Sequence, residues 1–240
     1  MSYFRRLSRS SIVALAAAGA LASAPAVAMA QLFSPSVYVR ASNSPFAAIG
    51  GFGYFYLENF EDHLFNTPGV TASAGGVTSV VFGPQIHDSV DEDDGVLDGS
   101  GLAGDDYFSS NGQAGITFTF NALALGGLPT HAGLVWTDGL NDIFFEAFDQ
   151  NGVSLGTRTG THANNSFNGE TDDDRFYGAV NAGGISRIVI RNGVAGIEID
   201  HLQYGRIGQQ AVVPEPSTAA LVGTGLLAAG ASARRRARRR

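Results

Sequence analysis

The amino-acid sequence predicts an all-β fold, a β-sandwich or jelly roll, flanked by an N-terminal signal peptide and a C-terminal transmembrane helix. Short runs of β-branched and aromatic residues recur between clusters of Gly, Asn, Asp and Ser. Several runs alternate apolar with polar residues, as in Ile116-Thr117-Phe118-Thr119-Phe120, which is the pattern of a strand with one buried face. No long segment shows the helical period of about 3.6 residues. Strands spaced about 8 to 12 residues apart favour a sandwich or jelly roll.

Each predicted strand is a run of strand-forming residues bounded by turn formers. In chain order these are an aromatic run at 54–60, a valine-rich run at 77–82, the alternating run at 115–121, apolar runs at 133–137 and 143–149, mixed runs at 153–158 and 175–180, an isoleucine-rich run at 185–191 and a second alternating run at 196–204. Turns are predicted where Gly follows Asn, Asp or Ala, at 137–139, 150–152, 181–184 and 191–193. The acidic, glycine-rich segment 88–112 is too polar for a core and predicts a long surface loop.

The first 30 residues have the three parts of a secretory signal peptide. Arg5, Arg6 and Arg9 form a basic start, and an apolar stretch follows at 11–21. Ala28-Met29-Ala30 supplies the small residues of a cleavage site, which places the mature start at Gln31. Residues 1–30 are therefore predicted to be a signal peptide removed by signal peptidase, and 31–209 to be the β-sandwich ectodomain.

The C-terminal segment 210–240 has an equally specific order of parts. The motif at 213–218 reads Val213-Pro214-Glu215-Pro216-Ser217-Thr218, and its prolines favour an extended, accessible backbone. An uncharged stretch at 219–233 follows, shorter than the roughly 20 residues of a full membrane span. The basic tail at 234–240 contains six arginines, which favour the cytoplasmic side. The alternative is a buried soluble helix with a basic tail.

This order of motif, short apolar helix and basic end resembles the PEP-CTERM sorting signal of exported bacterial proteins. The resemblance implies processing by an exosortase, an inner-membrane intermediate held by the C-terminal helix, and a final place at the cell surface or in the extracellular matrix of a Gram-negative bacterium. The segment 128–148 is also similar to a run found in the β-rich ectodomains of such proteins, for which no catalytic role is implied.

Charge and composition exclude several classes of function. The chain has no cysteine and no lysine, so no disulfide framework supports it. Between residues 31 and 213 there are 21 acidic residues and six arginines, a net charge of −15. Such a surface repels nucleic acid and anionic lipid, favours solubility, and attracts divalent cations.

The first candidate site is a calcium site in the acidic loop. Asp91, Asp93 and Asp98 place carboxylates close together beside glycines, and calcium accepts six to eight oxygens in flexible geometry. The spacing is not that of an EF-hand, since Gly95 stands where that loop needs Asp or Asn. The alternative is a mobile, solvated loop without metal.

The second candidate pairs acids near the two ends of the body, Glu61 and Asp62 with Asp200. This pattern resembles secreted carbohydrate-binding jelly rolls, and the resemblance implies a structural calcium held by these three residues. The alternative is that the acids face solvent on alternating strands.

The third candidate is a saccharide contact at Trp136 and Asp138, because an aromatic ring beside a carboxylate can stack on a sugar and accept its hydroxyl hydrogens. The alternative places Trp136 in the core and Asp138 in a hairpin turn. The G-x-S-x-G pattern at 152–156 follows a predicted turn and opens a strand, whereas a nucleophile elbow joins a strand to a helix.

With no catalytic constellation in view, the sequence favours a non-catalytic surface or matrix protein that adheres to or organises extracellular polysaccharide. The alternative is a secreted hydrolase acting on polysaccharide. The expected partners are signal peptidase, an exosortase and extracellular polysaccharide, with no nucleic acid.

We predict that the exported protein begins at Gln31, because Ala28 and Ala30 fit the small pockets of signal peptidase. N-terminal sequencing of protein recovered from outside the cytoplasm checks this. A chain that still begins at Met1 would show that the segment is an uncleaved anchor.

Overall fold

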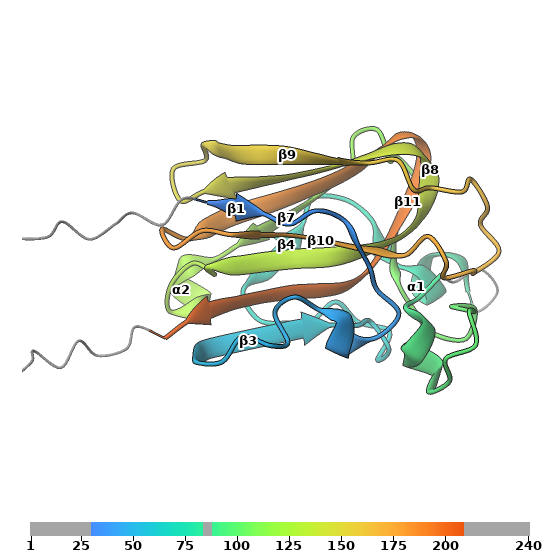
Figure 1. The fold of residues 1–240 in the computed structure, drawn as a ribbon, viewed down its shortest axis with the longest axis horizontal. Helices are drawn as coiled ribbons and strands as arrows, with labels where there is room; N and C mark the ends of the chain where they lie inside the picture. The colour runs from blue at the N-terminus through green and yellow to red at the C-terminus, as the bar shows by residue number, and fades with distance from the viewer. Residues whose placement is uncertain (1–29, 84–87, 209–240) are drawn as a thin grey trace, which may run out of the picture.

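A computed structural model describes residues 30–83 and 88–208, and it is mostly β-structure (Figure 1). The strands are β1 (Gln31–Leu32), β2 (Ser36–Val37), β3 (Phe52–Glu58), β4 (Val70–Ala72), β5 (Gly76–Val77), β6 (Tyr107–Ser109), β7 (Ile116–Phe120), β8 (His131–Asp149), β9 (Ser154–Gly160), β10 (Arg175–Val180) and β11 (Ile185–Ile207). Short helical turns are η1 (Ala41–Asn43), α1 (Thr78–Phe82), η2 (Asp91–Asp94) and α2 (Ala122–Leu125).

The two longest strands, β8 and β11, hold the sheet together. They pair with each other along most of their lengths, with several register shifts near the middle. One half of β8 has β10 as its outer neighbour and the other half has β9. Similarly, β11 pairs with β7, then β6, then β3 along its length. All eleven strands thus belong to one antiparallel sheet, which changes neighbours where β8 and β11 curve together (Figure 1).

Side chains from the two halves of the sheet meet in a shared core. Phe145, in the later half of β8, lies 6.0 Å from Tyr177 of β10, measured between ring centroids. Phe120 of β7 lies 5.0 Å from Tyr204 near the end of β11. All four side chains are buried. The mostly-β class is confirmed, whereas a two-sheet sandwich or jelly roll stays a prediction.

Several predicted elements match the structure and three do not. The run at 175–180 is β10, and the turns at 150–152 and 181–184 connect β8 to β9 and β10 to β11. The turns predicted at 137–139 and 191–193 are wrong, because β8 and β11 continue through them. Long-range pairing prevails there: Gly139 takes a φ of 156° at a register shift instead of closing a hairpin.

The buried Asn192 shows the same effect of tertiary structure. Its side-chain oxygen accepts a hydrogen bond of 2.8 Å from Trp136 Nε1, and its amide donates to the carbonyl of Gly196. A turn residue is thereby used as a core polar link between β8 and β11.

The strand predicted at 77–82 is also wrong, because β5 ends at Val77 and α1 follows. The carboxylate of Asp105 accepts the Ser79 amide hydrogen at the start of α1, at 3.0 Å. Val80 and Val81 are exposed, so the valines that suggested a strand do not enter the core. The capping carboxylate of Asp105 lies 26 residues after Ser79 in the sequence, so local propensity could not predict the helical turn.

Segment 88–112 is only in part the surface loop that its polarity predicts, since residues 94–99 are exposed but several of its acids are not. Asp88, Asp91, Asp105 and Asp106 are all buried, with exposed fractions of 6 % or less. The segment packs against the curved middle of β8 and β11, beside α1 (Figure 1). Backbone amides donate to Asp91 and Asp105, whereas one oxygen of Asp88 has no hydrogen-bond partner among the described residues.

The chain enters and leaves the sheet at one end. Gln31 pairs with Val180, Val180 with His131, and His131 with Gly205, so the first and last strands end in one row across the sheet. The acidic segment and α1 lie at the opposite end, while α2 lies near the chain ends (Figure 1). No helix within residues 30–83 and 88–208 is long and apolar enough to cross a membrane. The predicted signal peptide, 1–30, lies outside the described residues except for Ala30, and the predicted segment 210–240 lies wholly outside them.

We predict that Phe145→Ala lowers the free energy of unfolding by about 3–5 kcal/mol, because it leaves a cavity between the two halves of the sheet. Urea unfolding of the exported chain measures this. Leu123→Ala is the control, since Leu123 is 95 % exposed on α2 and its change should stay within about 0.5 kcal/mol. Equal losses in the two variants would contradict a shared core.

Candidate functional site

Three buried carboxylates converge at the curved middle of the sheet. Asp138 of β8 and Glu198 of β11 are cross-strand partners, and Asp88 reaches them from the segment before η2. One oxygen from each residue lies within 4.8 Å of the oxygens of the other two. Their exposed fractions are only 3 % to 8 %. We call Asp88, Asp138 and Glu198 the acidic trio.

Two further acids surround the trio. Asp106, directly before β6, and Asp174, directly before β10, are both fully buried. The charge of Glu198 raises the pKa of Asp106, while a side-chain hydrogen bond with Asp106 lowers that of Glu198. The charge of Asp174 raises the pKa of Asp88, and the charge of Asp138 raises that of Asp174. Within residues 30–83 and 88–208, no hydrogen-bond donor reaches either carboxylate oxygen of Asp174. The site therefore gathers five buried carboxyl groups, and two of them, Asp88 and Asp174, have carboxylate oxygens without a hydrogen-bond donor among the described residues.

Among the described residues no cation forms an ion pair with the trio, although the charge of Arg175 lowers the pKa of Asp174. The ion pairs in the described part of the chain join His63 to Asp105 and His201 to Asp93, outside the trio. Arg175 adjoins Asp174 in sequence, but its guanidinium donates to backbone carbonyls of Asp172 and Asp174.

Burial disfavours the charged form of each trio member. It raises the pKa of Asp138 to about 7, that of Glu198 to about 8 and that of Asp88 to about 11, and neighbouring carboxylates add to the shift. Burial also holds the pKa of Asp106 and of Asp174 well above the usual range. At neutral pH, protons or a bound cation must neutralise much of this cluster.

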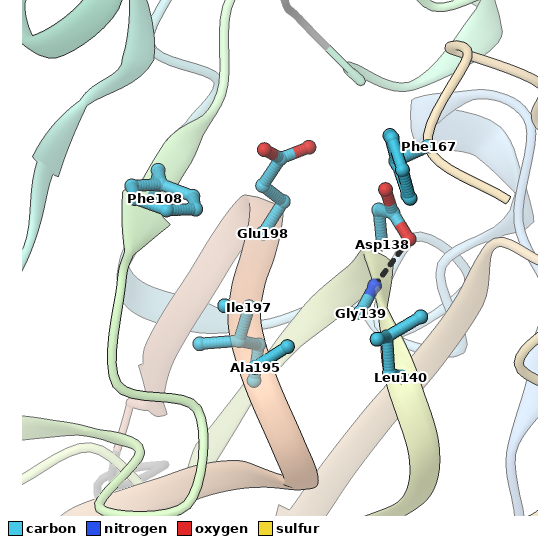
Figure 2. A pocket seen from close by; sticks show the side chains of 9 residues that line it. Phe108, Asp138, Gly139, Leu140, Phe167, Ala195, Ile197 and Glu198 are labelled. Atoms are coloured by element: carbon cyan, nitrogen blue, oxygen red, sulfur yellow. Dashed lines mark hydrogen bonds between the residues drawn. The ribbon is translucent and has the colours of Figure 1, made fainter. Parts of the chain in front are cut away.

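A pocket of about 270 Å³ opens onto two of the trio residues. In Figure 2, the carboxyl groups of Asp138 and Glu198 point to the same side, between the rings of Phe108 and Phe167. The Asp138 carboxylate also accepts the amide hydrogen of Gly139. Apolar side chains complete the lining, including Leu140, Ala195 and Ile197. The pocket thus combines apolar walls with two acidic groups.

A second cluster is formed by Asp93, Asp200 and His201. Its side chains make hydrogen bonds to one another and to nearby residues. His201 Nε2 lies 3.0 Å from the Asp93 carboxylate, and Nδ1 lies 2.8 Å from the Tyr38 hydroxyl. Asp200 accepts amide hydrogens from Val90 at 2.9 Å and from His201 at 2.5 Å. These contacts fasten the acidic segment to β11, which is a structural task.

The six residues predicted for calcium are only partly brought together. Asp93 and Asp200 meet in the second cluster. Asp91 closes its own loop by accepting the amide hydrogens of Asp98 and Gly99, both at 3.0 Å. The exposed Asp98 caps Ser100 at 3.2 Å.

Glu61 and Asp62 likewise bind backbone amides. Glu61 accepts the amide hydrogen of Asp105 at 2.6 Å, and Asp62 accepts that of Leu64 at 3.0 Å. The structure therefore places neither of them with Asp200 in one ligand set.

The two residues predicted for saccharide contact also separate. Trp136 is fully buried and offers no face to a ligand, whereas Asp138 lies on the pocket floor. Sequence reasoning missed Asp88, Glu198, Asp106 and Asp174. The available signal was that each is an acid directly beside or within a predicted strand or the acidic segment.

We predict that the protein loses stability as the pH rises from 5 to 8 when divalent cations are chelated. A carboxyl with a raised pKa binds more protons when folded than when unfolded, so the stabilisation is greatest near the unfolded pKa of about 4 and is lost through the folded values of about 7 and 8. Thermal melts should show a fall on the order of 5 °C.

Glu198→Gln should reduce this fall, because a neutral amide replaces a group that titrates in the window. Asp98→Asn, at an exposed carboxylate of the same segment, is the control. A melting temperature that stays level or rises over this pH range would contradict the prediction.

Comparison with known proteins bears on the C-terminal segment. Residues 212–236 match the PEP-CTERM protein-sorting motif, in the segment whose order of parts predicts it. No curated protein and no solved structure matches the chain. The motif implies handling by an exosortase. The chain therefore carries a PEP-CTERM sorting motif and is an exported, exosortase-sorted protein anchored at the cell surface.

Proposed function

We propose that the protein is a non-catalytic surface or matrix protein that adheres to or organises extracellular polysaccharide. The observation that carries this proposal is the pocket lined by Phe108 and Phe167 above the carboxyl groups of Asp138 and Glu198 (Figure 2). Aromatic rings stack on the apolar face of a sugar, and carboxyl groups bind its hydroxyls.

The position of the pocket suits a surface protein. The described chain ends at Gly208, at the end of the sheet where β1 also begins. The sorting motif follows Gly208 in sequence, whereas the pocket lies at the curved, opposite end of β8 and β11 (Figure 1). A ligand bound there is held away from the end that leads to the sorting segment.

An exposed aromatic ring at the pocket, with an exposed leucine on the neighbouring loop, supports a binding face. Phe167 is 68 % exposed and Leu102 is 52 % exposed, in two loops that meet through the hydrogen bond from Gly101 to Gly169 at 2.7 Å.

A hydrolase acting on polysaccharide is the second candidate. It is favoured by one observation, namely two carboxyl groups with raised pKa side by side at a pocket floor. Retaining glycosidases hold two carboxyls about 5 Å apart. Asp88 argues against this assignment, because a third carboxylate in the same space would oppose the charge separation that an acid and a nucleophile need.

We predict that Phe167→Ala weakens polysaccharide binding about tenfold, since loss of a stacking ring costs on the order of 1 kcal/mol or more. Co-sedimentation of the exported protein with extracellular polysaccharide purified from the producing cells measures this. Phe167 is largely exposed, so the variant should keep its thermal stability.

Leu123→Ala is the matched control, because Leu123 is also exposed but lies on α2 near the chain ends (Figure 1). Equal binding by both variants would show that the pocket does not bind the polysaccharide. Release of soluble saccharide during incubation would favour the hydrolase.

A further inference from the structure

We propose that the acidic trio, Asp88, Asp138 and Glu198, is a calcium-binding site, with Asp106 and Asp174 as neighbouring acids that supply ligands or bind the water around the ion. This site differs from the calcium ligands that the sequence suggests, and it stands independently of polysaccharide binding. It joins three parts of the chain: β8, β11 and the segment before η2.

The first argument is the shortage of partners for buried acids. Asp174 is fully buried, and neither of its carboxylate oxygens has a hydrogen-bond donor within the described residues. One oxygen of Asp88 is in the same condition, although Asp88 is only 3 % exposed. A buried carboxylate without a donor is costly, and a cation removes that cost.

The second argument is geometry. Calcium binds oxygens at about 2.3–2.6 Å, so two ligands of one ion lie at most about 5 Å apart. The trio offers three oxygens that all lie within 4.8 Å of one another. Three acids from separate segments meet this limit without rearrangement of the backbone, and the pocket leaves room for water or ligand oxygens.

The third argument concerns which metal fits. The trio offers only carboxylate oxygens, and the chain has no cysteine. Zinc and copper favour nitrogen and sulfur ligands, whereas calcium accepts six to eight oxygens in irregular geometry. Magnesium requires a tighter octahedron and gives up its water reluctantly. The ligand set therefore favours calcium.

The second cluster does not compete for this assignment. His201 contributes a nitrogen that is paired with Asp93, and Asp200 already accepts two backbone amide hydrogens. Its ligand atoms are therefore more engaged in hydrogen bonds within the protein than those of the trio, and one of them is a nitrogen, which calcium does not favour.

The test is a set of thermal melts of the exported chain at pH 8 in chelator, in calcium and in magnesium. At a calcium concentration a hundredfold above the dissociation constant, the melting temperature should rise by about 5–10 °C relative to chelator. Magnesium should give a much smaller rise, and calorimetric titration should show saturable calcium binding. Equal midpoints in chelator and calcium would overturn the proposal.

Variants of the trio should keep or raise the melting temperature in chelator, and they should reduce the rise in melting temperature that calcium produces. Asp138→Asn and Glu198→Gln remove a like charge from a buried cluster, so each should melt at or above the wild-type temperature in chelator at pH 8. Each should lose most of the rise that calcium produces. Because the variants are stabilised without metal, loss of the calcium effect cannot be attributed to misfolding.

Asp98→Asn is the matched control, since it removes a carboxylate of the same segment that lies on the surface. It should keep the full calcium effect. A trio variant that keeps the full effect, or an Asp98→Asn variant that loses it, would move the site to the acidic loop and overturn the assignment. A protein that binds calcium but no polysaccharide would leave this site intact and refute only the adhesive function.

Discussion

The antiparallel pairing of β8 with β11 is the constraint on which the rest of the structure depends. These strands give the other strands their neighbours, and the sheet changes neighbours where both strands curve. The pairing also sets Asp138 directly across from Glu198, which brings two acids together in the interior. Backbone hydrogen bonds along two long strands supply the cohesion that holds like charges at this distance.

The acidic interior is a local cost that the fold tolerates. Most buried polar groups of a protein have hydrogen-bond partners, yet Asp174 has none within the described residues. Nearby acids such as Asp91 and Asp200 are satisfied by backbone amides, so burial of a carboxylate alone does not mark a site. The distinction lies in the partners. Asp91 and Asp200, which hold loops together, each accept two backbone amide hydrogens, while Asp88 and Asp174 retain oxygens without a donor among the described residues, as functional sites often do.

The fold also separates the ends of the described chain from the pocket. The ends of the described chain lie together in one row across the sheet, and the pocket and acidic trio lie where β8 and β11 curve (Figure 1). In the function proposed above, a ligand in the pocket is held away from the end of the described chain that the sorting motif follows in sequence. The sheet between the two ends has a shared core rich in aromatic side chains.

The sequence by itself determined the sorting motif, the strand-rich composition and the position of local turns such as 150–152, because these depend on residues adjacent in the chain. Predictions from local sequence were wrong where residues distant in the chain make the contacts. Asn192 accepts a hydrogen bond from the buried Trp136 instead of forming a turn, and Asp105 caps the helical turn at Ser79. The site followed the same rule. The sequence showed many acids, but only the register between β8 and β11 brought Asp138 to Glu198, and only the packing of the segment before η2 added Asp88. Tertiary structure decided which carboxylates lost their water, and burial, which no local pattern reports, made them a candidate site.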